Sequence, residues 1–290
     1  MFKAIDSPYL VPFNRNFQYT DAPTKPPDGV KPKDELKTRL DKLTEELDRL
    51  QRVLYAQDRY ALLLIFQAMD AAGKDSTIRA VMKGVDPTGC QVYSFKQPSS
   101  KEVDHDFLWR TVRCLPERGR IGIFNRSYYE EVLVVRVHPE YLERQRLPGQ
   151  INQGGFWEQR YESIQDHEKH IARNGTVLLK FWLNVSKEEQ AKRFLSRLEE
   201  PEKNWKFSPA DVRERAHWHD YMKAYEEALD ATSRPWAPWY AIPADNKAYL
   251  QVSVAEIIVK TLKSLDLKYP EVNNETRARC SEMRRLLRES

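Results

Sequence analysis

Residues 60–85 constrain the fold of this chain more than any other stretch. They begin with an apolar run of strand length, YALLLIF, continue with QAMDAA, and end with GKDSTIRAVMKGV, whose apolar residues recur at helical spacing. In a strand, tight loop and helix of this kind, backbone N–H groups and the positive end of the helix face one anion. Lys74 adds a mobile charge where a terminal phosphoryl group would lie. The stretch therefore predicts a phosphate-binding loop.

This loop departs from the usual pattern G-x-x-x-x-G-K-[ST] at two positions. Ala68 stands where the first glycine is expected, and Asp75 stands in place of the metal-binding hydroxyl. Asp70 lies inside the loop, where a carboxylate beside phosphates needs a cation between them. We interpret Asp70 as a group that binds Mg²⁺ or positions the acceptor, and the alternative is a turn aspartate that caps the helix at Gly73. The expected phosphate contacts are Ala71, Ala72, Gly73, Lys74, Asp75 and Ser76.

Length and composition favour one large α/β domain with helical additions. The chain has 290 residues, of which 41% are hydrophobic, and this suffices for a single core. It has no run of about eighteen apolar residues and no basic-then-apolar leader, so we expect a soluble, cytoplasmic protein with no membrane partner. Cys90, Cys114 and Cys280 are widely spaced, which predicts reduced thiols. The net charge of +4 is a small difference between 47 basic and 43 acidic residues and does not indicate a partner.

The N-terminal part predicts an extended arm followed by a helix. Residues 1–33 hold six of the seventeen prolines and little periodicity, so we expect an arm that crosses the surface of the domain or of a neighbour. From Asp34 a helix is expected, because leucines recur at alternating spacings of four and three as far as Leu54. Packing of this leucine stripe on the sheet is favoured over a coiled coil, which needs about three to four heptads. Dimerisation through the stripe is the alternative.

Strands alternate with helices in the rest of the chain. Beyond the loop, strands are expected at 91–95, 120–124, 176–183 and 239–242, and helices at 101–115, 156–171, 211–231 and 248–265. This order predicts a five-stranded, mostly parallel sheet covered on both faces, within a domain spanning 34–270. Residues 271–290 are expected to form a basic tail or helix. Sites in such sheets open at the C-terminal ends of the strands, so the loop and residues 125–126 should converge on one crevice.

The segment after the third strand carries candidate catalytic residues. Asn125 stands where an aspartate usually contacts a second Mg²⁺, and it brings hydrogen-bonding capacity without charge. Arg126 could stabilise charge on a transferred phosphoryl group with its fixed fork of donors. The alternative for Arg126 is an ordinary buried salt bridge. Glu130 lies a turn further on, where it could meet a metal or the acceptor.

A cluster of cations within about 186–211 predicts a lid. Arg193 and Arg197 are four apart on one helical face, and Lys203 and Lys206 follow in a loop, which suits closure over phosphates. The alternative is a solvated pair between Glu189 and Arg193. After the last strand, Lys247 is a candidate contact for a nucleotide base or phosphate.

Four segments together resemble one protein family. They are AMDAAGKDSTIR, FNRSYYEEVLVVRV, RFLSRLEEPEKNWKFSPAD and TSRPWAPWYAIPADNK. From the leucine-striped helix onward, the sequence resembles the second family of polyphosphate kinases. The resemblance implies a three-layer P-loop kinase fold and phosphoryl transfer between inorganic polyphosphate and purine nucleotides. It implies Mg²⁺ as the cofactor, for which Mn²⁺ can substitute. It also implies a homo-oligomer, a dimer or tetramer.

The resemblance also implies residue roles. Asp70 and Lys74 would act on metal and phosphates, Arg126 would stabilise the transfer, and Arg193 and Arg197 would belong to a lid that clamps the polyphosphate.

This chain differs from many members at three positions. It has Ala68 where they have glycine, Asn125 where they have aspartate, and Glu130 where others show asparagine. These differences resemble the third class of the family, which is expected to phosphorylate both nucleoside mono- and diphosphates.

Two other functions remain compatible with these motifs. An ATP-dependent nucleoside monophosphate kinase would share the loop, the sheet and an arginine lid, and would differ in its donor. A non-catalytic nucleotide- or nucleic-acid-binding module would use the cations without chemistry. We do not expect nucleic acid as a partner, because no basic and aromatic strand surface is predicted.

Overall fold

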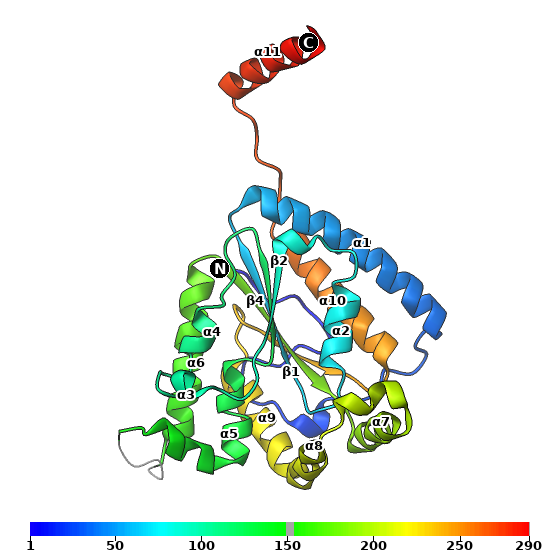
Figure 1. Ribbon diagram of the computed structural model, residues 1–290, viewed down its shortest axis with the longest axis vertical. Helices are drawn as coiled ribbons and strands as arrows, with labels where there is room; N and C mark the ends of the chain where they lie inside the picture. Colours follow the sequence, from blue (N-terminus) through cyan, green and yellow to red (C-terminus); the bar gives the residue numbers. More distant parts are fainter. Residues whose placement is uncertain (149–153, 290) are drawn as a thin grey trace.

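One parallel sheet lies at the centre of the computed structural model, which describes residues 1–148 and 154–289 (Figure 1). In this described part, five strands pair in the order β2-β3-β1-β4-β5, and all four pairings are parallel. The strands are β1 (Ala61–Gln67), β2 (Cys90–Ser94), β3 (Ile121–Asn125), β4 (Thr176–Asn184) and β5 (Trp239–Pro243). The predicted five-stranded α/β sheet is confirmed.

The burial of the strands follows from their places in the sheet. All seven residues of β1 are buried, because β1 is central and both of its faces are covered by helices. At the edge, β2 has exposed residues, Gln91 and Val92 among them. Phe66 of β1 pairs with Asn125 of β3, so these neighbouring strands end at the same level. This register places the phosphate-binding loop beside Arg126.

Helices cover both faces of the sheet (Figure 1). On one face α1 (Lys33–Gln57) and α2 (Lys74–Val81) contact α10 (Lys247–Ser264), and on the other α6 (Phe156–Arg173) contacts α9 (Trp218–Thr232). The leucine stripe of α1 lies in this chain's own core, where Leu47 and Leu54 are fully buried. The stripe is therefore not available as the seam of a coiled coil. It packs chiefly against α10, and not directly on the sheet as predicted.

Two predicted helices were wrong in extent. Residues 101–115 form two one-turn helices, α3 (Ser100–Val103) and α4 (Trp109–Val112). A capping box at Ser99 starts the first, and the Asp106 carboxylate accepts from the Leu108 amide in the turn between them. Such side-chain bonds to the main chain compete with helix continuation.

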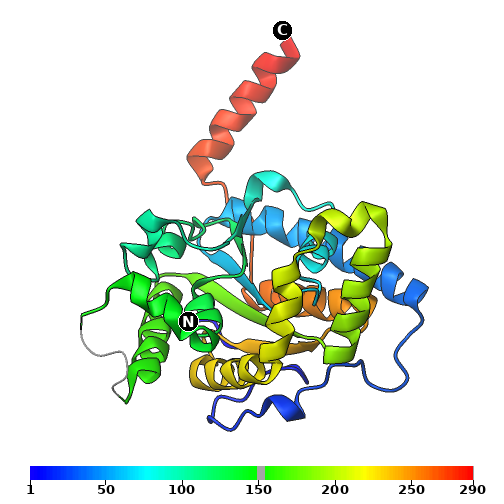
Figure 2. The same ribbon diagram turned by 60° about the horizontal axis from the view of Figure 1, so that its bottom comes forward.

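The predicted helix at 211–231 is divided as well. It consists of α8 (Pro209–Glu214), a 3₁₀ turn (Arg215–His217) and α9. The first piece begins at Pro209 because the Ser208 hydroxyl accepts from the Ala210 amide. The tighter turn lets α8 lie over the end of the sheet while α9 packs on its face (Figure 2).

The N-terminal segment runs along the β5 edge. The Ala241 amide donates to the Tyr9 carbonyl at 2.8 Å, and the Val11 amide donates to the Trp239 carbonyl at 2.9 Å. Phe2, Tyr9 and Phe17 pack against the core. Three cysteines, Cys90, Cys114 and Cys280, are free thiols. In the described residues, no helix combines the length and apolar character needed to cross a membrane.

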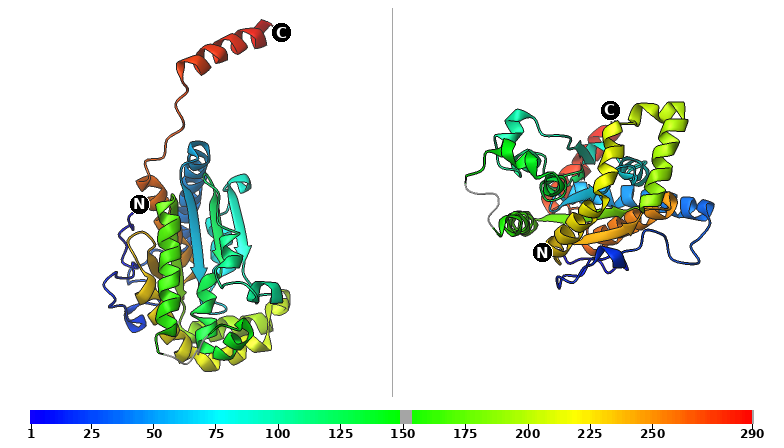
Figure 3. Two further views of the ribbon diagram at one scale, coloured as in Figure 1. Left: turned by 90° about the vertical axis from the view of Figure 1, so that its left-hand side faces the viewer. Right: turned by 90° about the horizontal axis from the view of Figure 1, so that it is seen from below.

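The remaining helices lie at opposite ends of the molecule. Near the C-terminal ends of the strands are α5 (Val134–Val137) and α7 (Lys187–Glu199) (Figures 1 and 2). At the other end α11 (Asn274–Glu289) stands clear of the body on an extended connection (Figure 3). The short 3₁₀ segments are Tyr19–Asp21, Pro87–Gly89, Tyr128–Glu131 (η3), Pro139–Gln145 and Pro201–Lys206.

Candidate active site

The loop between β1 and α2 has two residues in the left-handed region. Gly73 precedes the helix at φ +110°, where a side chain would be strained, and Ala71 has φ +61°. The Ala72 amide bonds back to the Met69 carbonyl at 3.3 Å, which closes the turn. The helix therefore begins directly at Lys74, and its free N-terminal amides face the C-terminal edge of the sheet.

Lys74 lies folded against its own loop. Its Nζ donates to the Ala68 carbonyl at 2.6 Å, and only 9% of the residue is exposed. Burial lowers the pKa of Lys74, and the nearby Asp70 carboxylate opposes this shift. A phosphate oxygen bound in the loop would therefore replace the Ala68 carbonyl as the acceptor of the hydrogen bond from Lys74.

Asp70 and Arg126 meet across the ends of β1 and β3. Asp70 Oδ1 accepts from Arg126 Nη2 at 2.9 Å, and about a third of each side chain is exposed. No side chain caps α2 at Gly73, so the alternative of Asp70 as a helix cap was wrong. The guanidinium also lies 3.7 Å from Glu130, whose side chain is 18% exposed. Arg126 thus forms salt bridges, as the alternative interpretation of this residue predicted, yet its side chain is 38% exposed.

The other candidates on β3 and η3 are placed differently. Asn125 Nδ2 donates to Asp75 Oδ1 at 2.6 Å, which ties the end of β3 to the start of α2. Glu130 does not line the cleft described below, and burial raises its pKa. Glu130 therefore pairs with Arg126 from outside the set of residues that line the cleft.

Arg193 is directed inward from α7. Its Nε donates to Glu189 at 2.8 Å, so the predicted i, i+4 pair exists, but only 8% of the Arg193 side chain is exposed and the pair is not solvated. The other four N–H groups donate at 2.6 to 3.1 Å to the carbonyls of Ala71, Ala72, Ala244 and Asp245. All five donors are occupied, so here Arg193 braces the loop at the strained Ala71 against the end of β5.

Replacing Arg193 with methionine is expected to lower the free energy of unfolding by about 2 to 4 kcal/mol, because four carbonyls, two buried and two partly buried, lose a charged donor. Arg197→Met is the control on the same helix. Its guanidinium has one ion pair, at 3.4 Å, and loss of such a partly exposed pair costs about 1 kcal/mol or less. Urea unfolding of both variants measures the difference, and equal losses would contradict the bracing role.

A cleft of about 950 Å³ opens above the loop. Most residues expected at the site line it: Asp70, Ala71, Ala72, Gly73, Lys74, Asp75, Ser76, Asn125, Arg126, Arg193, Arg197, Lys203 and Lys247. The side chain of Lys206, also expected there, lies outside the described residues. With Lys96, which also lines it, the cleft has cations from five separate segments of the chain.

Six lining residues were missed from the sequence: Ser94, Phe95, Lys96, Ser196, Ser208 and Asp211. Lys96 follows the end of β2, so the rule that sites form at C-terminal strand ends could have found it. Asp211 is the last residue of the predicted lid segment, and the sequence indicated no role for it.

The side of the cleft formed by α7 and the segment after it contains opposite charges. Arg197 Nη1 lies 3.4 Å from Asp211 Oδ2, and Lys203 pairs with Glu200. Burial, followed by the neighbouring Arg193, lowers the pKa of Lys247 at the start of α10. Burial also raises the pKa of Asp211, and the charge of Asp70 adds to this shift. The cleft thus contains carboxylates as well as cations.

Comparison with known proteins shows which family this architecture belongs to. The family model of polyphosphate kinase 2 matches residues 31–270. The chain belongs to the polyphosphate kinase 2 family. The resemblance found in the four motifs and the expected enzyme class, a phosphotransferase, are confirmed.

Individual relatives agree with the family match. The chain is 57% identical over 244 residues to an ADP-polyphosphate phosphotransferase of Rhodopseudomonas palustris, covering 84% of each protein. It is 44% identical over 229 residues to an AMP/ADP-polyphosphate phosphotransferase of Meiothermus ruber, covering 79% of this chain and 82% of the relative. The crystal structure of polyphosphate kinase 2 from Arthrobacter aurescens superimposes with a TM-score of 0.88 at 35% identity, covering 99% and 100% of the two chains. The predicted kinase fold is confirmed.

Proposed function

We propose that this polyphosphate kinase 2 transfers a phosphoryl group between inorganic polyphosphate and nucleoside mono- or diphosphates, converting AMP to ADP and ADP to ATP. The observation that carries the proposal is the cleft, where Lys74, Arg126, Arg197, Lys203 and Lys247 surround a helix N-terminus. Such a concentration of positive charge suits two strings of phosphates. The printed names of relatives that act on AMP and ADP with polyphosphate support both acceptors.

The protein contributes to this reaction mainly by positioning the two substrates and by stabilising negative charge. An oxygen of the acceptor's terminal phosphate attacks the end phosphorus of polyphosphate. The bridging P–O bond breaks, and the shortened polyphosphate leaves with the electron pair. Lys74 and Arg126 neutralise the equatorial oxygens of the group in transit, and Arg197 and Lys203 hold phosphates under the lid. In this proposal Lys247, which lines the cleft, contacts the nucleotide.

The residues present fit a divalent cation. Asp70 and Asp211 face the same cleft, and the pKa of Asp211 is raised partly by the charge of Asp70, so a cation between them would relieve repulsion. Among the described residues no cluster of three or more protein ligands forms a closed metal cage. This fits Mg²⁺, which binds one or two carboxylates together with phosphates and water. Bound Mg²⁺, or Mn²⁺, would be held by Asp70 and would offset charge on the phosphates.

The donor separates this proposal from an ATP-dependent nucleoside monophosphate kinase. Purified protein given AMP, polyphosphate and Mg²⁺ without ATP is expected to form ADP, followed by ATP, measured by chromatography of the nucleotides. ADP formation from AMP only when ATP replaces polyphosphate would favour that rival. A panel of AMP, ADP, GMP and GDP then tests the acceptor range. No turnover with any donor, together with salt-sensitive binding to nucleic acid, would favour the binding module.

We also propose a cytoplasmic homo-oligomer, a dimer or a tetramer. The free thiols of Cys90, Cys114 and Cys280 suit a reducing compartment. On α11 the side chains of Met283 and Leu286 are nearly half exposed, and a second copy would cover them.

A further inference from the structure

A lysine lies fully buried in the centre of the sheet. Lys180 of β4 has no exposed surface, and its Nζ donates to Glu168 Oε2 at 2.6 Å, to the Tyr129 hydroxyl at 2.9 Å and to the Thr232 carbonyl at 2.9 Å. All three ammonium donors are occupied. Glu168, from α6, is 1% exposed, so the two charges neutralise each other away from water.

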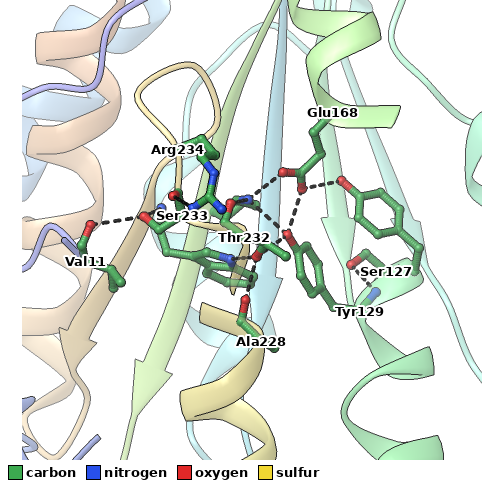
Figure 4. Close-up of polar contacts among 11 residues, drawn as sticks. Val11, Ser127, Tyr129, Glu168, Ala228, Thr232, Ser233 and Arg234 are labelled. Carbon is green, nitrogen blue, oxygen red and sulfur yellow. Dashed lines mark hydrogen bonds and ion pairs between the residues drawn. The ribbon is translucent and has the colours of Figure 1, made fainter. Parts of the chain in front are cut away.

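The Glu168 carboxylate also binds the segment that follows Arg126. Both tyrosines of η3, Tyr128 and Tyr129, bring their hydroxyls to 2.9 Å from Glu168 Oε1. Tyr129 lies in addition 2.8 Å from Thr232 Oγ1. The buried ion pair is thus the anchor of η3 on β4, α6 and α9 (Figure 4).

Hydrogen bonds continue from this anchor to the cleft. The Ser127 hydroxyl accepts from the Tyr129 amide at 3.2 Å. In the amide orientation that gives each group a partner, Gln67 accepts from the Ser127 amide at 3.1 Å and donates to Glu130 at 2.9 Å. Glu130 in turn lies 3.7 Å from the Arg126 guanidinium. The path from the buried ion pair to Arg126 thus runs through the backbone of Ser127 and Tyr129 and through hydrogen bonds of Gln67, and its last link is the ion pair between Glu130 and Arg126.

Arg126 needs such support because its backbone is strained. Its φ is +65°, a conformation that costs a non-glycine residue on the order of 1 kcal/mol and persists only when its surroundings hold it. On its N-terminal side the Arg126 amide donates to the Phe66 carbonyl at 3.0 Å. On its C-terminal side the segment is held by Ser127 and by the two tyrosines on Glu168.

We propose that Lys180 and Glu168 are positioning residues for phosphoryl transfer, acting through Tyr129 to hold Arg126 in its left-handed conformation with the guanidinium facing the cleft. This inference rests on the proposed role of Arg126. A buried ion pair adds little net stability compared with packed apolar side chains, so its expected contribution is to geometry. The pair touches no substrate, and its effect on the reaction passes through Arg126.

A double-mutant cycle tests the proposal. Tyr129→Phe removes one hydroxyl and keeps the ring, and it is expected to lower kcat about 10-fold with less than a 2-fold change in KM for polyphosphate and for AMP. In an Arg126→Ala background the same change is expected to lower kcat less than 2-fold, because the residue it positions is already gone. The combined change Lys180→Met and Glu168→Gln removes both charges together and is expected to behave like Tyr129→Phe.

Tyr240→Phe is the matched control. Its hydroxyl is buried and donates to the Ile5 carbonyl at 2.9 Å, far along the sequence from η3, so a merely structural loss should affect both tyrosine variants alike. We expect Tyr240→Phe to leave kcat within 2-fold. Amide hydrogen exchange gives a readout that does not need activity. Tyr129→Phe should speed exchange in residues 126–131 at least 10-fold without changing residues 70–77, and Tyr240→Phe should change neither.

The outcomes separate this inference from the proposed function. An equal loss of kcat from Tyr129→Phe in both backgrounds, or unchanged exchange at 126–131, would overturn the positioning role. If Arg126→Ala alone keeps normal kcat, Arg126 has no role in the transfer, and the proposed function of this residue fails. Hydrogen exchange at residues 126–131 of Tyr129→Phe then still tests whether the buried ion pair holds the backbone. Where Arg126→Ala is too slow for the cycle, hydrogen exchange decides.

Discussion

Replacing Lys74 with methionine is expected to lower kcat by about 10²-fold or more, equivalent to roughly 2.7 kcal/mol of transition-state stabilisation. The Lys74 ammonium is held at the loop by the Ala68 carbonyl, within reach of any phosphate bound at the start of α2. Methionine keeps most of the volume and removes the charge. Steady-state kinetics with AMP and polyphosphate measures the effect.

The control for Lys74 is Lys192→Met. Lys192 lies on α7, where 81% of its side chain is exposed, and it does not line the cleft. It changes the net charge by the same amount, so its kcat should stay within 2-fold of the unmodified protein. Near-normal turnover in Lys74→Met would exclude Lys74 from the transfer step.

Asp70→Asn is expected to nearly abolish Mg²⁺-dependent turnover and to raise the Mg²⁺ concentration needed for half-maximal rate at least 10-fold. Asparagine has the same shape as aspartate but lacks the charge that would hold the cation. Asn125, on the neighbouring strand, brings no charge that could substitute. Titration of the rate with Mg²⁺ is the measurement.

Asp70 also pairs with Arg126, so the loss of this ion pair has to be separated from the loss of a metal ligand. Asp75→Asn provides the comparison, because it removes a nearby carboxylate, in the first turn of α2, that accepts a hydrogen bond from Asn125. We expect a smaller change in the Mg²⁺ requirement for this variant. If Asp70→Asn lowers kcat while its Mg²⁺ requirement is unchanged, Asp70 acts through Arg126 and not as a metal ligand.

Helix boundaries show the limit of local patterns. The long helices α1 and α10 were predicted because their apolar periodicity extends over many turns. The predicted helices at 101–115 and 211–231 were wrong in extent because capping by Ser99, Asp106 and Ser208 sets the true beginnings and breaks. In these short pieces a single side-chain bond to the backbone outweighs periodicity.

The spacing of charged residues along a helix did not predict the direction in which each side chain points. Arg193 and Arg197 are four apart on α7, yet Arg193 turns inward to four carbonyls while Arg197 lines the cleft beside Asp211. The partners of Arg193 come from the loop and from the end of β5, more than fifty residues away on each side. Only the packed structure brings those carbonyls to one guanidinium.

The sequence by itself determined the order of the elements, the parallel sheet and the phosphate-binding loop. Each of these depends on short apolar runs, on the glycine and lysine before α2, and on the rule that parallel strands open their site at one edge. Tertiary structure alone decided which charges face the cleft, which brace the loop, and which, like Lys180 and Glu168, lie buried under it. The reason is physical: a charge settles where its donors and acceptors are satisfied, and those partners lie far away in the sequence.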